Sequence, residues 1–156
     1  MSLDYYFCVA GLTAASCAER LVRDTGLELQ SASEARLGLR LSGPGLAVWV
    51  NDDLEESSRA WAARHGVAAD VEMLLTQAKQ LDPAPIHRRI ALVVGTALRA
   101  TAGDALFHFT QGPRLELMRR DGVVRVDDDP GGFWHTFPGT LRGLGLACSF
   151  ARLPGI

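Results

Sequence analysis

Two clusters of carboxylates are the densest chemistry-bearing groups in this sequence. The first cluster is Asp52, Asp53, Glu55 and Glu56, and the second is Asp127, Asp128 and Asp129. The simplest interpretations are a helix N-terminus, which acidic residues stabilise, and a solvated loop. The alternative is a negatively charged face that binds a basic protein. Charges of this kind steer association and set specificity more than they deepen affinity.

A metal site is another chemistry that these carboxylates suggest. The histidines are His65, His87, His108 and His135, and the last of them closely follows the second cluster. Carboxylates and imidazoles suit divalent ions. However, consecutive residues of an extended segment point to alternate faces, so three adjacent aspartates cannot easily chelate one ion. We therefore expect neither a metal ion nor another cofactor.

Catalytic motifs are not recognisable in the chain. It contains no Gly-x-x-x-x-Gly-Lys-Ser/Thr loop, no Gly-x-Gly-x-x-Gly fingerprint, no Gly-x-Ser-x-Gly elbow and no His-Glu-x-x-His. Neither Cys8 nor Cys148 has a local context that would activate its thiol. We expect that the protein is not an enzyme and that its function is to bind another protein.

The tryptophans are candidates for a binding surface. Trp49, on an expected strand, and Trp61, on an expected helix, are typical of core packing. Trp134 follows a Gly-Gly pair and is flanked by Phe133 and His135, which makes it the best candidate for an exposed aromatic residue. Packing over the sheet is the slightly favoured interpretation even there. Trp134 and the two acidic clusters form the predicted partner-binding set.

Composition and charge limit the function further. A chain of 156 residues with 47% hydrophobic and 22% charged residues is typical of one globular domain. The net charge of −2, without a basic stripe, argues against a nucleic-acid partner. The odd number of cysteines, with no Cys-x-x-Cys, favours free thiols in a reducing compartment. We see neither a signal peptide nor a membrane span, and we expect a soluble cytoplasmic protein without a membrane partner.

Hydrophobic periodicity predicts a mixture of strands and helices. The expected strands are 3–10, 35–41, 46–50, 71–78, 105–110, 114–120 and 123–126, with a further extended segment at 146–150. The expected helices are 13–26, with Thr13 as its N-cap and Gly26 at its end, and a short one within 52–66 that Asn51 or Asp52 could cap. A long helix is expected from Asp82, as N-cap before a proline at the first position, to near Gly103, with a helical turn after Pro138. Tight turns between strands imply antiparallel pairing. The sequence thus predicts a single α+β domain over residues 1–156, with a mostly antiparallel sheet and two main helices packed on one face.

Three segments carry a resemblance to a known family. They are Gly-Asp-Ala-Leu-Phe-His-Phe at 103–109, Leu-Glu-Leu-Met-Arg-Arg-Asp-Gly at 115–122, and Phe-Trp at 133–134. They resemble the C-terminal half of the immunity proteins of bacterial Sit-type toxin–immunity pairs, and the opening residues 1–5 are similar too. The resemblance covers about half of the chain. It implies a cytoplasmic protein that binds and blocks a cognate toxin domain, and it supplies no catalytic residues.

Two other classes of function stay open at this point. One is a small-molecule-binding or enzymatic α+β domain with a pocket between the sheet and the long helix. Phe107, Phe109, Trp134 and His135 would line that pocket, although no acid–base pair or oriented nucleophile accompanies them. The other is a structural subunit of a larger assembly.

Overall fold

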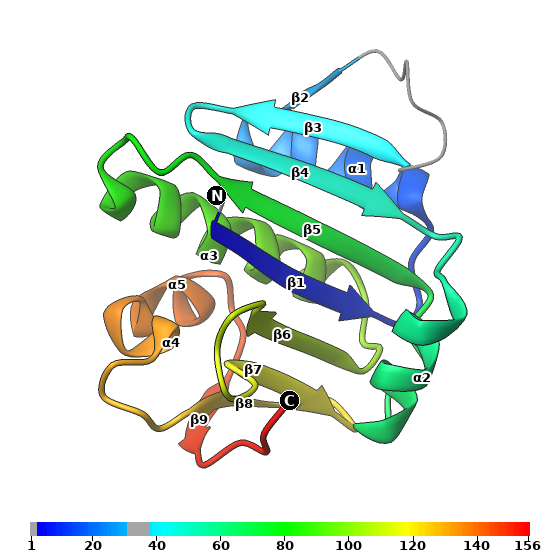
Figure 1. Cartoon of the computed structure of the whole chain (residues 1–156), viewed down its shortest axis with the longest axis vertical. Helices are drawn as coiled ribbons and strands as arrows, with labels where there is room; N and C mark the ends of the chain where they lie inside the picture. The colour runs from blue at the N-terminus through cyan, green and yellow to red at the C-terminus, as the bar shows by residue number, and fades with distance from the viewer. Residues whose placement is uncertain (1–2, 31–37) are drawn as a thin grey trace.

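The computed structural model describes residues 3–30 and 38–156, and in this part of the chain nine strands form one sheet (Figure 1). The strands are β1 (Leu3–Val9), β2 (Glu28–Leu29), β3 (Leu39–Gly43), β4 (Leu46–Asn51), β5 (Val71–Gln77), β6 (Ala105–Phe109), β7 (Leu117–Arg120), β8 (Val123–Asp127) and β9 (Cys148–Ala151). Their spatial order is β2-β3-β4-β5-β1-β6-β7-β8-β9. All neighbouring pairs are antiparallel except β8 and β9, which are parallel. The predicted α+β class and the mostly antiparallel sheet are confirmed.

The helices begin and end where the local sequence favours it. They are α1 (Ala14–Thr25), α2 (Glu56–Arg64), α3 (Pro83–Ala100), α4 (Phe133–Thr136) and α5 (Pro138–Gly143). Thr13 caps α1, because its hydroxyl accepts a hydrogen bond from the backbone N–H of Ser16 at 3.1 Å. Gly26 ends α1 with a φ of 72°, a left-handed conformation that glycine adopts without strain. Asp82 caps α3, with proline at its first position as predicted.

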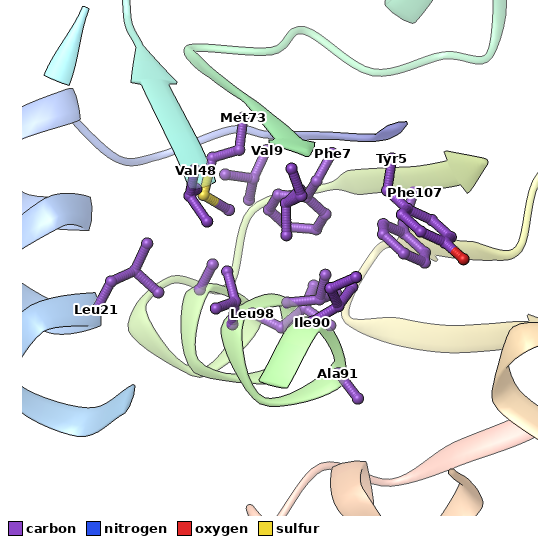
Figure 2. Close-up of a cluster of buried hydrophobic side chains, with 14 of the residues drawn as sticks. Tyr5, Phe7, Val9, Leu21, Val48, Met73, Ile90, Ala91, Leu98 and Phe107 are labelled. Carbon is purple, nitrogen blue, oxygen red and sulfur yellow. The ribbon is translucent and has the colours of Figure 1, made fainter. Parts of the chain in front are cut away.

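The two main helices, α1 and α3, pack on the same face of the sheet, as predicted (Figure 1). Figure 2 shows the core between them and the strands, where Phe7 of β1 and Ile90 of α3 are completely buried. Leu21 of α1 is completely buried in the same cluster. Full burial of a side chain of this size contributes roughly 1.5–3 kcal/mol. We call this side of the sheet the covered face.

The opposite face is covered over only part of its area. Under α2, a second cluster of buried residues comprises Cys8, Ala62, Val67, Leu106, Leu115 and Leu153. These residues come from β1, β6, α2, the segments after α2 and before β7, and the segment after β9, so this cluster lies under one half of the sheet. The half formed by β3, β4 and β5 has no helix over it among the described residues (Figure 1). We call that half the open face.

Several boundaries differ from those predicted. The expected strand at 35–41 lies partly outside the described residues, and β3 begins at Leu39 and forms the predicted hairpin with β4. The expected strand at 114–120 begins only at Leu117. The aromatic residues at 133–136, for which the sequence indicated no regular element, form α4. None of the helices in the described ranges combines the length and apolar character that crossing a membrane requires.

The predicted cap of the short helix is wrong. Asn51 or Asp52 was expected to cap it, whereas α2 begins at Glu56 and has Glu55 at its N-cap position. The carboxylate of Asp52 instead accepts a hydrogen bond from the backbone N–H of Ala14, at 2.8 Å. A capping carboxylate satisfies the nearest unpaired helix donors. Here these donors belong to α1, which the fold brings next to Asp52.

Candidate binding surface on the open face of the sheet

A single row of side chains crosses the sheet on the side away from α1 and α3. The strand register places Arg40 beside Trp49, Trp49 beside Leu74, Leu74 beside Tyr6, and Tyr6 beside His108. Successive residues of a strand point to opposite faces, so the neighbours of these residues fill the covered face while the row itself points away from it. We call these five side chains the open-face row.

The middle of the open-face row is accessible. Leu74 is 39% exposed, and Trp49 and Tyr6 are half-buried. Leu75, the next residue along β5, is completely buried on the covered face. An exposed leucine between two aromatic residues leaves a continuous apolar strip on the surface, and such strips mark interaction sites more often than isolated apolar residues do.

The other end of the open-face row lies under α2. The ring of Trp61 packs edge-on against Tyr6, with centroids 5.5 Å apart and planes at 90°, and lies 4.9 Å from the imidazole of His108. Offset and edge-to-face contacts of this kind are the favourable geometries for aromatic pairs. Burial lowers the pKa of His108, and nearby His65 lowers it further. Because Trp61 packs against both Tyr6 and His108, this end of the row supports the accessible part.

Tyr6, which lies between Leu74 and His108 in the row, is fixed by hydrogen bonds. Its hydroxyl donates to Oε2 of Glu72 at 2.7 Å, and Nδ2 of Asn51 donates to Oε1 of the same carboxylate at 3.4 Å. Burial first, and then the proximity of Cys8 and Glu72, raises the pKa of Tyr6 well above its usual value. The phenol therefore stays a neutral donor, held in one orientation.

Two hollows flank Tyr6. The first, of about 490 Å³, is lined by Tyr6, Trp49, Asn51, Asp53, Glu55, Ser58, Glu72 and Leu74. The second, of about 320 Å³, is lined by Tyr6, Ser57, Ser58, Trp61, His108, Thr110 and Ile156. We call them the acidic hollow and the aromatic hollow. Together they form two recesses in the exposed part of the sheet, and each is large enough to receive a side chain.

The structure divides the first acidic cluster between two roles. Asp53 and Glu55 line the acidic hollow, whereas the carboxylate of Asp52 is engaged at the start of α1. Glu56 is exposed in the first turn of α2, where its charge suits the positive end of the helix. The helix N-terminus predicted for this cluster is thus correct for Glu55 and Glu56, and half of the cluster also faces the open-face row.

The structure also divides the second acidic cluster, because Asp127 is buried at the end of a strand whereas Asp128 and Asp129 follow it in the loop that the sequence indicated. Asp127 belongs to β8, is only 4% exposed, and accepts a hydrogen bond from the backbone N–H of Leu153 at 2.9 Å. Arg114 reaches both Asp127 at 3.4 Å and Asp129 at 3.3 Å. Asp128 is exposed. The arginine compensates the buried charge of Asp127, whose carboxylate holds Leu153 against the sheet, while Asp128 and Asp129 remain accessible to solvent.

Trp134 is not an exposed aromatic residue. It is 1% exposed and packs on the covered face, with its ring 5.0 Å from that of Phe133 and 5.8 Å from that of Phe107. The favoured interpretation, packing over the sheet, is the correct one. Its indole therefore cannot contact a partner without a rearrangement of α4.

The alternative interpretation of the sequence expected a pocket between the sheet and the long helix, and side chains fill this space. Phe107 is completely buried against Trp134, and Phe109 lies against Tyr5 with ring centroids 5.2 Å apart. His135 is exposed, and its ring lies 4.6 Å from that of Phe150. Neither hollow beside Tyr6 includes any of these four residues.

The titratable groups of this region form no cluster suited to a metal ion among the described residues, and its thiol is unreactive. Within the described ranges, no three histidines, cysteines or acidic residues are grouped so that they could hold a metal ion. Burial raises the pKa of the Cys8 thiol to about 12, which keeps it protonated and unreactive at neutral pH. The open face thus offers stacking surfaces, carboxylates and a neutral phenol.

Sequence reasoning missed most of this surface. Tyr6, Glu72 and Leu74 were not singled out, and Trp49 was taken as core. One signal was present: Leu74 occupies a position of β5 whose neighbours on the same face, Glu72 and Thr76, are polar. A large apolar residue on the polar side of an alternating strand indicates either a second packing layer or a contact surface.

Comparison with protein-family models, with curated proteins and with solved structures gives no match for this chain.

Proposed function

We propose that this chain is a cytoplasmic immunity protein that binds a cognate bacterial toxin domain through the open face of its sheet and neutralises it by occupying it. The observation that carries the proposal is the open-face row, in which Trp49, Leu74 and Tyr6 form an accessible apolar strip between two hollows. The resemblance of residues 103–134 to Sit-type immunity proteins supplies the class of partner.

The composition of the open face suits a protein partner. Strands lie about 4.8 Å apart and rise about 3.3 Å per residue, so the three strands of the open face span roughly 15 Å across and 20 Å along the strands. This area is smaller than the roughly 800 Å² that each partner contributes to a standard interface, so a partner would also contact β1, the loop after β4 and the edge of α2. Tryptophan and tyrosine at the centre of such a patch are the residue types that dominate binding energy.

The open face is also held in shape before binding. The carboxylate of Glu72 fixes Tyr6, and the ring of Trp61 supports it from the side of α2. Side chains that are already ordered lose less conformational entropy when a complex forms. Neutralisation by occupancy needs tight binding and no chemistry, which agrees with a surface that offers rigid aromatic contacts and no activated nucleophile.

The test begins with the gene immediately upstream of this chain, which should encode a secreted protein with a toxin-like C-terminal domain. Co-expression of the chain should restore growth of cells that produce this domain, and the two purified proteins should form a stable complex in size-exclusion chromatography. If the folded chain neither protects these cells nor binds the domain, the proposal is wrong.

A matched pair of variants tests the surface. Leu74 on the open face and Val22 on α1 are both 39% exposed. Leu74→Arg places a bulky charge in the apolar strip and should reduce affinity at least 100-fold, whereas Val22→Arg, on the outer side of a helix, should protect cells like the wild type. Equal protection by the two variants would show that the toxin binds elsewhere.

A further inference from the structure

We infer that the open face binds a partner segment that presents an arginine side chain, and that the acidic hollow receives the guanidinium group. The inference rests on the proposed function, because the segment belongs to the toxin domain. It specifies the chemistry of recognition, which the resemblance to immunity proteins leaves undefined.

The shape and lining of the acidic hollow suit a long side chain with a charged end. One wall is formed by Trp49, Leu74 and Tyr6, which are accessible apolar surfaces. Arginine places its methylene groups along apolar surface of this kind while its guanidinium reaches a polar region. The hollow has a volume of about 490 Å³ and opens to solvent between β4, β5 and the start of α2.

The charged residues that line the hollow all have the same sign. Three carboxylates line it, and they come from three elements: Glu72 from β5, Asp53 from the loop after β4, and Glu55 from the N-cap of α2. None of the residues that line the hollow in the described structure is basic. A partner side chain of positive charge is therefore complementary to this part of the open face.

Asn51 positions the backbone of Asp53 and the carboxylate of Glu72 beside the hollow. Asn51 donates from Nδ2 to the carbonyl oxygen of Asp53 at 3.1 Å and accepts from its backbone N–H at 3.0 Å. The same amide group lies 3.4 Å from Oε1 of Glu72. These bonds use the backbone of Asp53, so its carboxylate oxygens are not consumed by them. Glu55 likewise makes no capping hydrogen bond with its side chain.

A guanidinium group already lies over the ring of Trp49, on the side away from the hollow. The Cζ atom of Arg40 on β3 lies 5.5 Å from the centroid of the indole. The hollow lies toward β5, on the other side of Trp49 in the strand order. This contact shows that the indole at this position accepts a planar cation. Arginine fits better than lysine, because its planar group stacks on aromatic rings and binds carboxylates in a bidentate manner.

The probe for the test is N-acetyl-arginine-N-methylamide, titrated into the full chain labelled with ¹⁵N and followed by the indole N–H signal of Trp49. The neutral isostere N-acetyl-citrulline-N-methylamide is the control ligand. The arginine probe should shift this signal saturably with a dissociation constant in the millimolar range. The citrulline probe should bind at least 10-fold more weakly, and added salt should weaken only the arginine probe. Equal shifts by the two probes would overturn the inference.

Matched variants locate the site. Asp53→Asn with Glu55→Gln removes two charges from the hollow and should weaken the arginine probe at least 5-fold. Glu19→Gln with Glu28→Gln removes two exposed charges from α1 and β2 and should leave binding unchanged. An equal effect of the two double variants would reduce the interaction to net charge and overturn the assignment of the hollow.

Binding of the toxin domain separates the two proposals. If the wild-type chain protects cells and the Asp53→Asn, Glu55→Gln variant loses at least 10-fold in association rate, both are supported. If that variant binds and protects like the wild type, arginine recognition is wrong and the immunity function stands. If the wild-type chain does not bind the toxin domain, the immunity function is wrong, and the arginine inference falls with it as a statement about the partner.

Discussion

The two faces of this sheet are built from the same strands and differ in what lies on them. On the covered face, α1, α3, α4 and α5 bury an almost continuous layer of aliphatic and aromatic side chains. On the opposite side, only the half under α2 is closed, and the open-face row keeps Leu74 and Trp49 within reach of solvent. Because Leu74 and Leu75 are adjacent in β5, residue type alone does not decide burial.

This difference separates stability from recognition. A side chain on the covered face contributes to the core by contacts on every side, and removing it leaves a cavity. Truncating a side chain in the accessible part of the open-face row changes the stability of the isolated protein only a little, because water takes its place. The same side chain becomes important when a partner covers it.

The largest expected effect is on the free energy of unfolding when core aromatics are truncated. Phe107→Ala should destabilise the chain by about 3–5 kcal/mol, because Phe107 is completely buried among Tyr5, Phe133 and Trp134. Trp49→Ala removes a larger ring from the open face and should cost less than half of that. Urea denaturation followed by circular dichroism measures both. Equal losses would show that the open face is part of the core.

The two acidic clusters should differ in the same way, with a smaller effect. Asp127→Ala leaves the backbone N–H of Leu153 and the guanidinium of Arg114 without their buried acceptor, and should cost about 1–3 kcal/mol. Asp53→Ala, whose carboxylate is exposed beside the acidic hollow, should change stability by less than about 0.5 kcal/mol. Equal unfolding midpoints for these two variants would contradict the structural role of Asp127.

The smallest expected effect is a pH dependence at the closed end of the open-face row. The folded protein holds the pKa of His108 below 6.5, chiefly through burial, so the unfolded chain binds the proton more readily. Stability from this group is complete above pH 6.5 and is lost as the pH falls through the lowered value. His108→Gln should therefore flatten the decrease in unfolding free energy between pH 7 and pH 5. An unchanged slope would mean that another group causes the decrease.

Local patterns in the sequence predicted the covered face well. Alternation in β1 and the helical repeat of Ile90, Val93, Val94 and Ala97 identify the residues that α3 and the sheet bury. Thr13, Asp82 and the glycine after α1 mark helix ends, since each satisfies or terminates a helix by itself. These features depend on neighbours within a few positions of the chain.

The open-face row was out of reach of such patterns because it is defined by register. Trp49, Leu74 and Tyr6 become neighbours only when β4, β5 and β1 pair side by side. The same applies to Arg114 and Asp127. Their ion pair accompanies the burial of a carboxylate that the sequence placed in a solvated loop. α4 was missed for a related reason, since four residues cannot form a stable helix without the packing of Phe133 and Trp134.

The central position of β1 has a consequence for how the protein forms during synthesis. β1 pairs with β5 and β6, and Val9 meets Ala105 only after about a hundred further residues have been made. At roughly 5–20 residues per second, the ribosome takes about 5–20 s to cover that distance. Until β5 has been made, the apolar side chains of β1 have neither of their neighbouring strands, and until β6 has been made they have only one of the two. Such long-range pairing slows folding and leaves the growing chain dependent on protection from aggregation until β6 emerges.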